Sequence, residues 1–230
     1  MRTSYVYQSR KKKKKMATYE MTISEITRVC KLIGVIRSFE DGRTDSAIKE
    51  KPFLEQMKKS LIEAHPTWDV VISPPRAACD VMVNSIRINL KLTDCKSSDN
   101  SMSKPSVYYS ITGLTNYPYS SNWNEFFDRV ANGQAKKVRD RTTEYHYLVK
   151  NKITGDVLLK SIFDIHTYVS NPSNHLQISW KNEFANIEYR TTDEEYLKKV
   201  QSLLRCIQKS VRDMIENSKR FAEADLTLLE

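Results

Sequence analysis

Glycine is scarce in this chain, with five residues among 230, and none of them stands in the spacing of a nucleotide-binding loop. Neither GxGxxG nor GxxxxGK[ST] occurs, which excludes the familiar glycine-rich loops that cradle nucleotide phosphates. No apolar run approaches the roughly 18 residues that a membrane-spanning helix needs. We therefore expect no nucleotide cofactor and no membrane partner.

Cysteine and histidine are also few, with four of each, and their spacing points to no metal or redox motif. No two cysteines form CxxC, and none stands beside a histidine at zinc spacing. This disfavours a zinc hydrolase and a cysteine–histidine nucleophile. We expect ordinary buried thiols in a reducing compartment, which here means a bacterial cytoplasm.

Basic charge is concentrated at the N-terminus. Residues 1–16 hold seven of the 37 basic residues and no acidic one, so the remaining chain has a net charge of only +2. A run such as Lys11–Lys15 is typical of a solvated, disordered segment. We expect residues 1–16 to form a disordered basic tail and residues 17–230 to form a single domain. The tail either binds nucleic acid phosphates, serves as a nuclear-type signal, or precedes an alternative start at Met16.

The hydrophobic pattern predicts alternating helices and strands. A capping box at Thr192 and Glu195 opens the last helix, and Gly113 ends a shorter one. The predicted fold class is therefore α/β, a single domain with a central mixed β-sheet flanked by helices. The predicted helices cover residues 22–34, 52–64, 105–112 and about 192–221, and the strands cover residues 68–73, 79–83, 86–92, 144–150, 157–162 and 176–180.

Apolar residues of the last helix form one stripe, which we expect to pack on the sheet; a dimer helix is the alternative. We interpret the large aromatic residues as core rather than as stacking platforms. The stripe consists of Leu197, Val200, Leu204, Ile207, Val211, Met214, Ser218 and Phe221, and the aromatic residues are Trp123, Trp180, Tyr108 and Tyr109.

The segment from Pro75 to Leu92 has the strongest chemical pattern. Asp80 begins one strand of a predicted hairpin, and Asn89 and Lys91 lie two residues apart on the next strand, so both project from the same face. Hard divalent cations take oxygen ligands, here the Asp80 carboxylate, the Asn89 amide and the Leu90 carbonyl. Lys91 would then orient a water and stabilise charge on a phosphate. On spacing alone, an ordinary solvated hairpin face is the more probable interpretation.

The same residues resemble the catalytic core of the PD-(D/E)xK nuclease superfamily, particularly type II restriction endonucleases in their NxK form. Asp80 matches the first acid, Lys91 matches the lysine, and Asn89 replaces the middle acid. The proline is not adjacent to Asp80, since the nearest is Pro75. The resemblance extends over residues 45–220 and includes the stretches at 91–93, 97–100, 106–113, 147–156 and 171–177.

The resemblance implies a restriction-endonuclease-like fold, Mg²⁺ as cofactor, a homodimer and an upstream helix acid, either Glu50 or Glu55. It places the catalytic core at about residues 45–115 and DNA-recognition and dimer elements at about 116–225. Three loops carry residue types suited to DNA contact. The candidate contacts are Lys96, Ser97, Asn100, Ser101 and Lys104, then Lys136, Lys137, Arg139 and Arg141, then Asn171, Asn174, His175 and Gln177.

The sequence thus predicts a type II restriction endonuclease that hydrolyses double-stranded DNA with Mg²⁺. The alternatives are a repair or junction nuclease of the same superfamily and a DNA-binding protein with a decayed nuclease site. The decayed nuclease site stays an alternative because Asn89 stands in place of an acid. A plain structural or partner-binding α/β domain is a further alternative, and it predicts no salt-dependent DNA binding.

Overall fold

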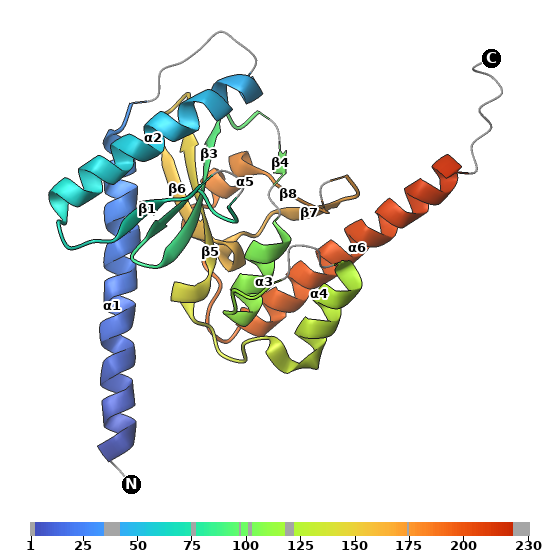
Figure 1. Ribbon diagram of the computed structural model, residues 1–230, viewed down its shortest axis with the longest axis horizontal. Coiled ribbons are helices and arrows are strands. Elements are labelled where there is room, and N and C mark those ends of the chain that lie inside the picture. Colours follow the sequence, from blue (N-terminus) through green and yellow to red (C-terminus); the bar gives the residue numbers. More distant parts are fainter. Residues whose placement is uncertain are drawn as a thin grey trace.

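Strand β3 is the middle strand of a five-stranded mixed sheet in the computed structural model (Figure 1). The strand order is β1-β2-β3-β5-β6; β3 and β5 are parallel and the other neighbours are antiparallel. A smaller antiparallel sheet has the order β4-β8-β7. The chain is a single α/β domain, which confirms the predicted fold class. The structure describes residues 3–34, 42–74, 77–96, 98–100, 103–117, 122–173 and 175–222.

Helices and strands follow one another along the chain as the colours of Figure 1 run from blue to red. The helices are α1 (Thr3–Leu32), α2 (Gly42–Ala64), α3 (Lys104–Thr112), α4 (Trp123–Arg129), α5 (Trp180–Ala185) and α6 (Tyr196–Ala222), with short helical turns at Val130–Gln134, Arg141–Thr143 and Ile162–Asp164. The strands are β1 (Val70–Ile72), β2 (Val81–Val83), β3 (Ile86–Thr93), β4 (Asp99–Asn100), β5 (Tyr145–Asn151), β6 (Val157–Ser161), β7 (Tyr168–Asn171) and β8 (His175–Ile178).

Each face of the large sheet packs against its own hydrophobic core. Ile88 and Leu90 of β3 point to the face that α1 and α2 cover, where Ile26 and Met57 are fully buried. The opposite face carries residues such as Tyr147 of β5 and packs against α3, α4, α5, α6 and the small sheet. The side-chain alternation of β3 therefore leaves Arg87, Asn89 and Lys91 half-buried on that second face.

The predicted hairpin of β2 and β3 is confirmed. Asn84 and Ser85 both have positive φ, 48° and 73°, as a two-residue hairpin turn requires. The Asn84 side chain also accepts a hydrogen bond from the Asp69 backbone amide at 3.1 Å, which ties the turn to the residue before β1. This turn sets the register in which Val81 pairs with Ile88.

Two helices begin earlier than predicted. Helix α1 starts at Thr3, so the tail expected to be disordered belongs to a helix, as lysine's good helix propensity allows. Tyr19 anchors that helix to β5 through a 2.7 Å hydrogen bond to His146 Nε2. Helix α2 starts at Gly42, so Pro52 lies inside the helix and not at its first position.

Helix α6 packs on the small sheet with only part of the predicted stripe. The capping box is present, because Glu195 N donates to Thr192 Oγ1 at 3.3 Å and Thr192 N donates to Glu195 Oε2 at 3.1 Å. Leu197 is 45% exposed, whereas Leu203 is fully buried, so the buried face is rotated from the predicted one. Within the described residues, no helix is both long and apolar enough to cross a membrane.

The structure corrects one predicted DNA contact, Arg139. Its side chain is fully buried and forms the centre of an ionic network. Its guanidinium donates two hydrogen bonds to Glu144 at 2.7 and 2.9 Å and one to Asp164 at 2.9 Å. Thr191 N donates to the same Asp164 carboxylate, so the network connects β5, the turn after β6 and the approach to α6. Arg139 therefore stabilises the fold and is not available to DNA.

We expect Arg139→Ala to lower the free energy of unfolding by about 3–5 kcal/mol, because it leaves two buried carboxylates without their shared cation. The measurement is urea unfolding followed by tryptophan fluorescence. The matched control is Lys137→Ala in the same loop, where the side chain is exposed and the change should stay within about 0.5 kcal/mol. Equal stability of the two variants would contradict the structural role of Arg139.

Candidate active site

Asp80 lies directly before β2 and is held at both its backbone and its side chain. Its backbone amide donates to the Ile88 carbonyl at 2.9 Å, and its carbonyl accepts from Ser73 N at 2.9 Å. Its carboxylate oxygen Oδ2 accepts two further hydrogen bonds, from Leu90 N and from Asn89 Nδ2, each 2.7 Å long. The structure thus brings Asp80 and Asn89 together, in line with the geometry that the hairpin pattern predicts.

The bond to Asp80 fixes the orientation of the Asn89 amide. A carboxylate accepts hydrogen bonds, so the amide nitrogen must face Asp80 and the amide oxygen Oδ1 must point away from that contact. The Leu90 N–H points to the edge of β3 at which Asp80 lies, because it donates to Asp80 Oδ2. In a β-strand, the N–H and the carbonyl of one residue point to the same edge. The Leu90 carbonyl therefore lies on the edge of β3 beside Asp80, beyond the first residue of β2.

Lys91 interacts electrostatically with three carboxylates from different elements: Glu50 of α2, Asp80 and Asp99 of β4. Burial raises the pKa of Glu50, the charge of Lys91 lowers it, and Asp80 and Asp99 raise it further. Burial likewise raises the pKa of Asp99, and Lys91 partly offsets that rise. Of the two predicted accessory acids, Glu50 belongs to this set of charges. Glu55 is exposed on α2 and is not among the charges that shift the pKa of Glu50 or of Asp80.

Burial also raises the pKa of Asp80, and the Leu90 N–H and Lys91 only partly compensate. A half-buried acid beside a lysine is a frequent feature of functional sites, because folding alone does not favour its charged form. Asp99 is the one acid of this group that the sequence analysis did not single out. Its signal was weak, since it lies in a polar loop and pairs with β8 only through a two-residue strand.

The oxygen atoms around Asp80 are of the kind that Mg²⁺ prefers. The candidate ligands are Asp80 Oδ1, which lies outside both hydrogen bonds, Asn89 Oδ1 and the Leu90 carbonyl. Within the described ranges, no three histidine, cysteine, aspartate or glutamate side chains are close enough together to hold a metal. A metal here would therefore depend on one carboxylate and on neutral oxygen atoms.

Two of the three predicted DNA-contact loops meet at the small sheet. Asn100 of β4 pairs with Gln177 of β8, which joins the loop after β3 to the segment around His175. Lys96 is exposed and forms an ion pair with Asp94 at 3.3 Å. Asn171 Oδ1 accepts a hydrogen bond from Ser173 N at 2.8 Å within the β7–β8 turn. Ser97, Ser101, Asn174 and the side chain of Asn100 lie outside the described residues.

The third loop is largely structural. The Lys136 ammonium donates to Thr143 Oγ1 at 2.8 Å, and burial lowers the pKa of Lys136. Arg141 is partly buried and lies 3.8 Å from Glu20 and 3.7 Å from Asp193. With Arg139 in the core, Lys137 is the one residue of the four predicted contacts that is exposed.

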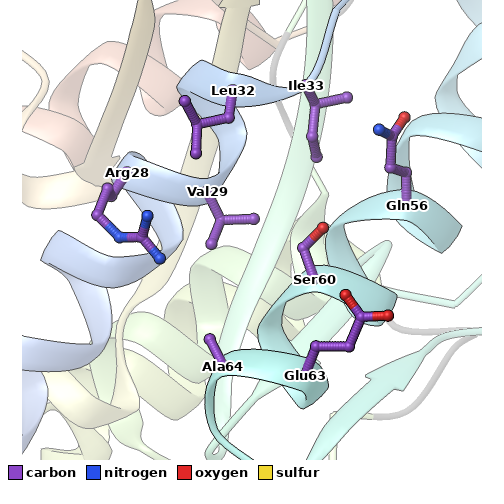
Figure 2. A pocket seen from close by; sticks show the side chains of 8 residues that line it. All are labelled: Arg28, Val29, Leu32, Ile33, Gln56, Ser60, Glu63 and Ala64. Atoms are coloured by element: carbon purple, nitrogen blue, oxygen red, sulfur yellow. The ribbon is translucent and has the colours of Figure 1, made fainter.

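A cavity of about 280 Å³ lies between α1 and α2, and Figure 2 shows the side chains that line it. Val29 and Ile33 are its buried apolar residues, and Arg28 and Glu63 are among its polar ones. Both helices pack on the face of the sheet opposite to Asn89 and Lys91. This cavity is therefore separate from the candidate active site.

No protein-family model matches the chain, and no curated protein matches it at a significant level. The resemblance to the PD-(D/E)xK nucleases thus stays a prediction from sequence. The candidate site depends on the geometry of Asp80, Asn89, Leu90 and Lys91.

We expect Asp80→Asn to stabilise the protein at neutral pH in the absence of divalent cations. Because the pKa of Asp80 is raised in the folded state, its contribution to stability is present below its ordinary pKa and is lost as pH rises through the raised pKa. Asparagine keeps an oxygen for the Leu90 amide and removes the charge. The advantage of the variant should vanish when the pH is lowered below the ordinary pKa of aspartate.

The measurement is urea unfolding across a pH series in EDTA. Asp128→Asn, on the exposed surface of α4, is the matched control and should unfold within about 0.5 kcal/mol of the wild type. A less stable Asp80→Asn protein at neutral pH would show that the Asp80 charge serves the fold, which would weaken its assignment to an active site.

Proposed function

We propose that this protein is a Mg²⁺-dependent endonuclease that hydrolyses phosphodiester bonds in double-stranded DNA, in the manner of a type II restriction enzyme. The observation that supports this most is the contact of Asp80 with Asn89 and the Leu90 amide, with Lys91 on the same face of β3. Oxygen ligands and an ammonium group at one strand edge suit a phosphodiester, which is anionic and needs both a nucleophile and charge stabilisation.

Each residue of the site has a chemical role in this proposal. Asp80, Asn89 and the Leu90 carbonyl would hold the cation, which when bound would polarise the phosphate and acidify a water. Lys91 places its ammonium beside the negative charge that develops on the phosphate as the water oxygen attacks phosphorus. One bridging P–O bond then breaks, which leaves a phosphate monoester and a hydroxyl. Glu50 and Asp99 are the other carboxylates on which the charge of Lys91 acts, since it lowers the pKa of each.

DNA would approach from the side of the small sheet. The chain passes from Thr93 at the end of β3 to Asp99 in β4 within six residues, and β4 pairs with β8. Amide and hydroxyl side chains of these segments are of the type that contacts base edges and phosphates. A homodimer would present two such sites to a palindromic sequence, as two-fold symmetry requires.

We expect Asp80→Ala and Lys91→Ala each to lower cleavage of plasmid DNA by at least about 10²-fold, because each removes a group that stabilises the transition state. Binding to DNA in Ca²⁺ should stay close to that of the wild type. The measurement is gel analysis of phage and plasmid DNA with Mg²⁺, with EDTA as the negative condition. Discrete fragments are expected.

Glu55→Ala is the matched control, since Glu55 is exposed on α2, and it should cleave as the wild type does. Normal cleavage by the Asp80 or Lys91 variant would refute the site assignment. A smear in place of discrete fragments would favour the non-specific or repair nuclease.

A DNA-binding protein with a decayed nuclease centre is the second candidate. It is favoured by the hydrogen bond of Asn89 Nδ2 to Asp80, which gives one oxygen of the carboxylate a partner without any cation. Asn89→Asp tests it, because the substitution replaces a donor with a second carboxylate beside Asp80 Oδ2. In a working enzyme we expect it to lower cleavage or change the preferred metal. Cleavage that appears only in the Asn89→Asp protein would establish the decayed site instead.

A further inference from the structure

Lys104, Trp123 and His175 form a cluster that three different elements contribute: α3, α4 and β8. The Lys104 ammonium lies 4.5 Å from the centroid of the Trp123 ring. The Trp123 indole N–H donates to His175 Nε2 at 3.3 Å, and the two rings are 5.0 Å apart. All three side chains are partly exposed, and Trp123 holds the other two in one place.

The indole bond determines which nitrogen of His175 is a donor. Since Nε2 accepts from Trp123, the neutral ring carries its proton on Nδ1. Burial, and then the charge of Lys104, lowers the pKa of His175, which keeps the ring neutral near neutral pH. The cluster therefore offers an ammonium and an imidazole N–H, both of them donors.

The backbone of His175 is held in an unfavourable conformation, with φ of 63°. Such a conformation is unfavourable for a non-glycine residue and persists only where the surroundings hold it. Ser210 of α6 is buried and imposes it here: its Oγ donates to the His175 carbonyl at 2.5 Å and accepts from Asn171 N at 3.0 Å. Helix α6 thus holds Asn171 and His175, the paired residues at the adjoining ends of β7 and β8.

Helix α3 adds positive potential at the same place. Lys104 is its first residue, its first turn contains no acidic residue, and the described N-cap residue Ser103 makes no side-chain capping bond. A lysine at a helix N-terminus adds its charge to the positive end of the helix dipole. Ser106, also in the first turn, donates to the Ala78 carbonyl at 2.8 Å, which places this end of α3 next to the residues that lead into Asp80.

We propose that Lys104 and His175, positioned by Trp123, bind a backbone phosphate of double-stranded DNA near the candidate active site. This inference depends on the proposed function and names one contact of the DNA substrate. A phosphate can accept hydrogen bonds from both donors, is favoured by the positive end of the α3 dipole, and needs no base recognition. The contact would fix the position of the duplex relative to Lys91 and contribute affinity without sequence preference.

The test is the salt dependence of binding to sheared duplex DNA in Ca²⁺, by fluorescence anisotropy. Lys104→Met keeps an unbranched side chain over Trp123 and removes one phosphate contact, so the slope of log K against log salt should become shallower by about 0.9. Lys59→Met, on the exposed side of α2, is the matched control and should leave the slope unchanged. Trp123→Phe keeps an aromatic ring but removes the N–H, so affinity should fall several-fold at an unchanged slope.

An unchanged slope in Lys104→Met, or an equal change in Lys59→Met, overturns the proposed contact while the endonuclease proposal stands. If Trp123→Phe binds DNA with the wild-type affinity, His175 and Trp123 do not take part in the proposed phosphate contact. If the wild-type protein itself shows no salt-dependent binding, the proposed function fails, and this inference fails with it.

Discussion

The alternation of side chains along β3 is the constraint on which the rest of the structure depends. Ile88 and Leu90 must enter the core under α1 and α2, so Asn89 and Lys91 must face the other way. A slip of one residue would exchange the two sets and bury a lysine among apolar side chains. The Asn84–Ser85 turn sets this register. Asp80, the residue before β2, supports it, because its carboxylate accepts a hydrogen bond from the Leu90 backbone amide.

The carboxylates of Glu144 and Asp80 differ in how their charge is compensated. Burial raises the pKa of Glu144, but hydrogen bonds and charge from Arg139 outweigh it, so that the net pKa is lowered. Asp80 instead receives an amide and a backbone N–H, and its pKa is raised. The first arrangement stabilises the fold with a charge, whereas the second keeps a charge in place at the expense of stability. A carboxylate of the second kind is suited to a cation, which would supply the missing compensation.

Features that depend on neighbouring residues could be predicted from the sequence. The β2–β3 hairpin, the Thr192–Glu195 capping box and the left-handed Gly113 that ends α3 all depend on residues a few positions apart. The proximity of Asp80 and Asn89 followed from the same hairpin.

Features that depend on distant residues were predicted wrongly or missed. Arg139 resembles its basic neighbours in sequence, and only Asp164, twenty-five residues later, makes it a core residue. Glu50 and Glu55 lie on one helix, and the packing of α2 on the sheet decides which of them approaches Lys91. Trp123 packs against the core as predicted, but its hydrogen bond to His175, 52 positions away, was missed.

The small sheet links the candidate active site to the candidate DNA contacts. Strand β4 follows β3 after a short loop and pairs with β8, whose first residue, His175, is anchored to α6 through Ser210. Helix α3 begins beside the same sheet and contacts the residues before Asp80 through Ser106. A duplex that contacts this surface is therefore held by elements that are themselves attached to both strands of the β2–β3 hairpin. If a phosphate binds at Lys104 and His175, the hydrogen bonds of Ser106 and Ser210 would hold it at a position relative to Lys91 that the fold determines.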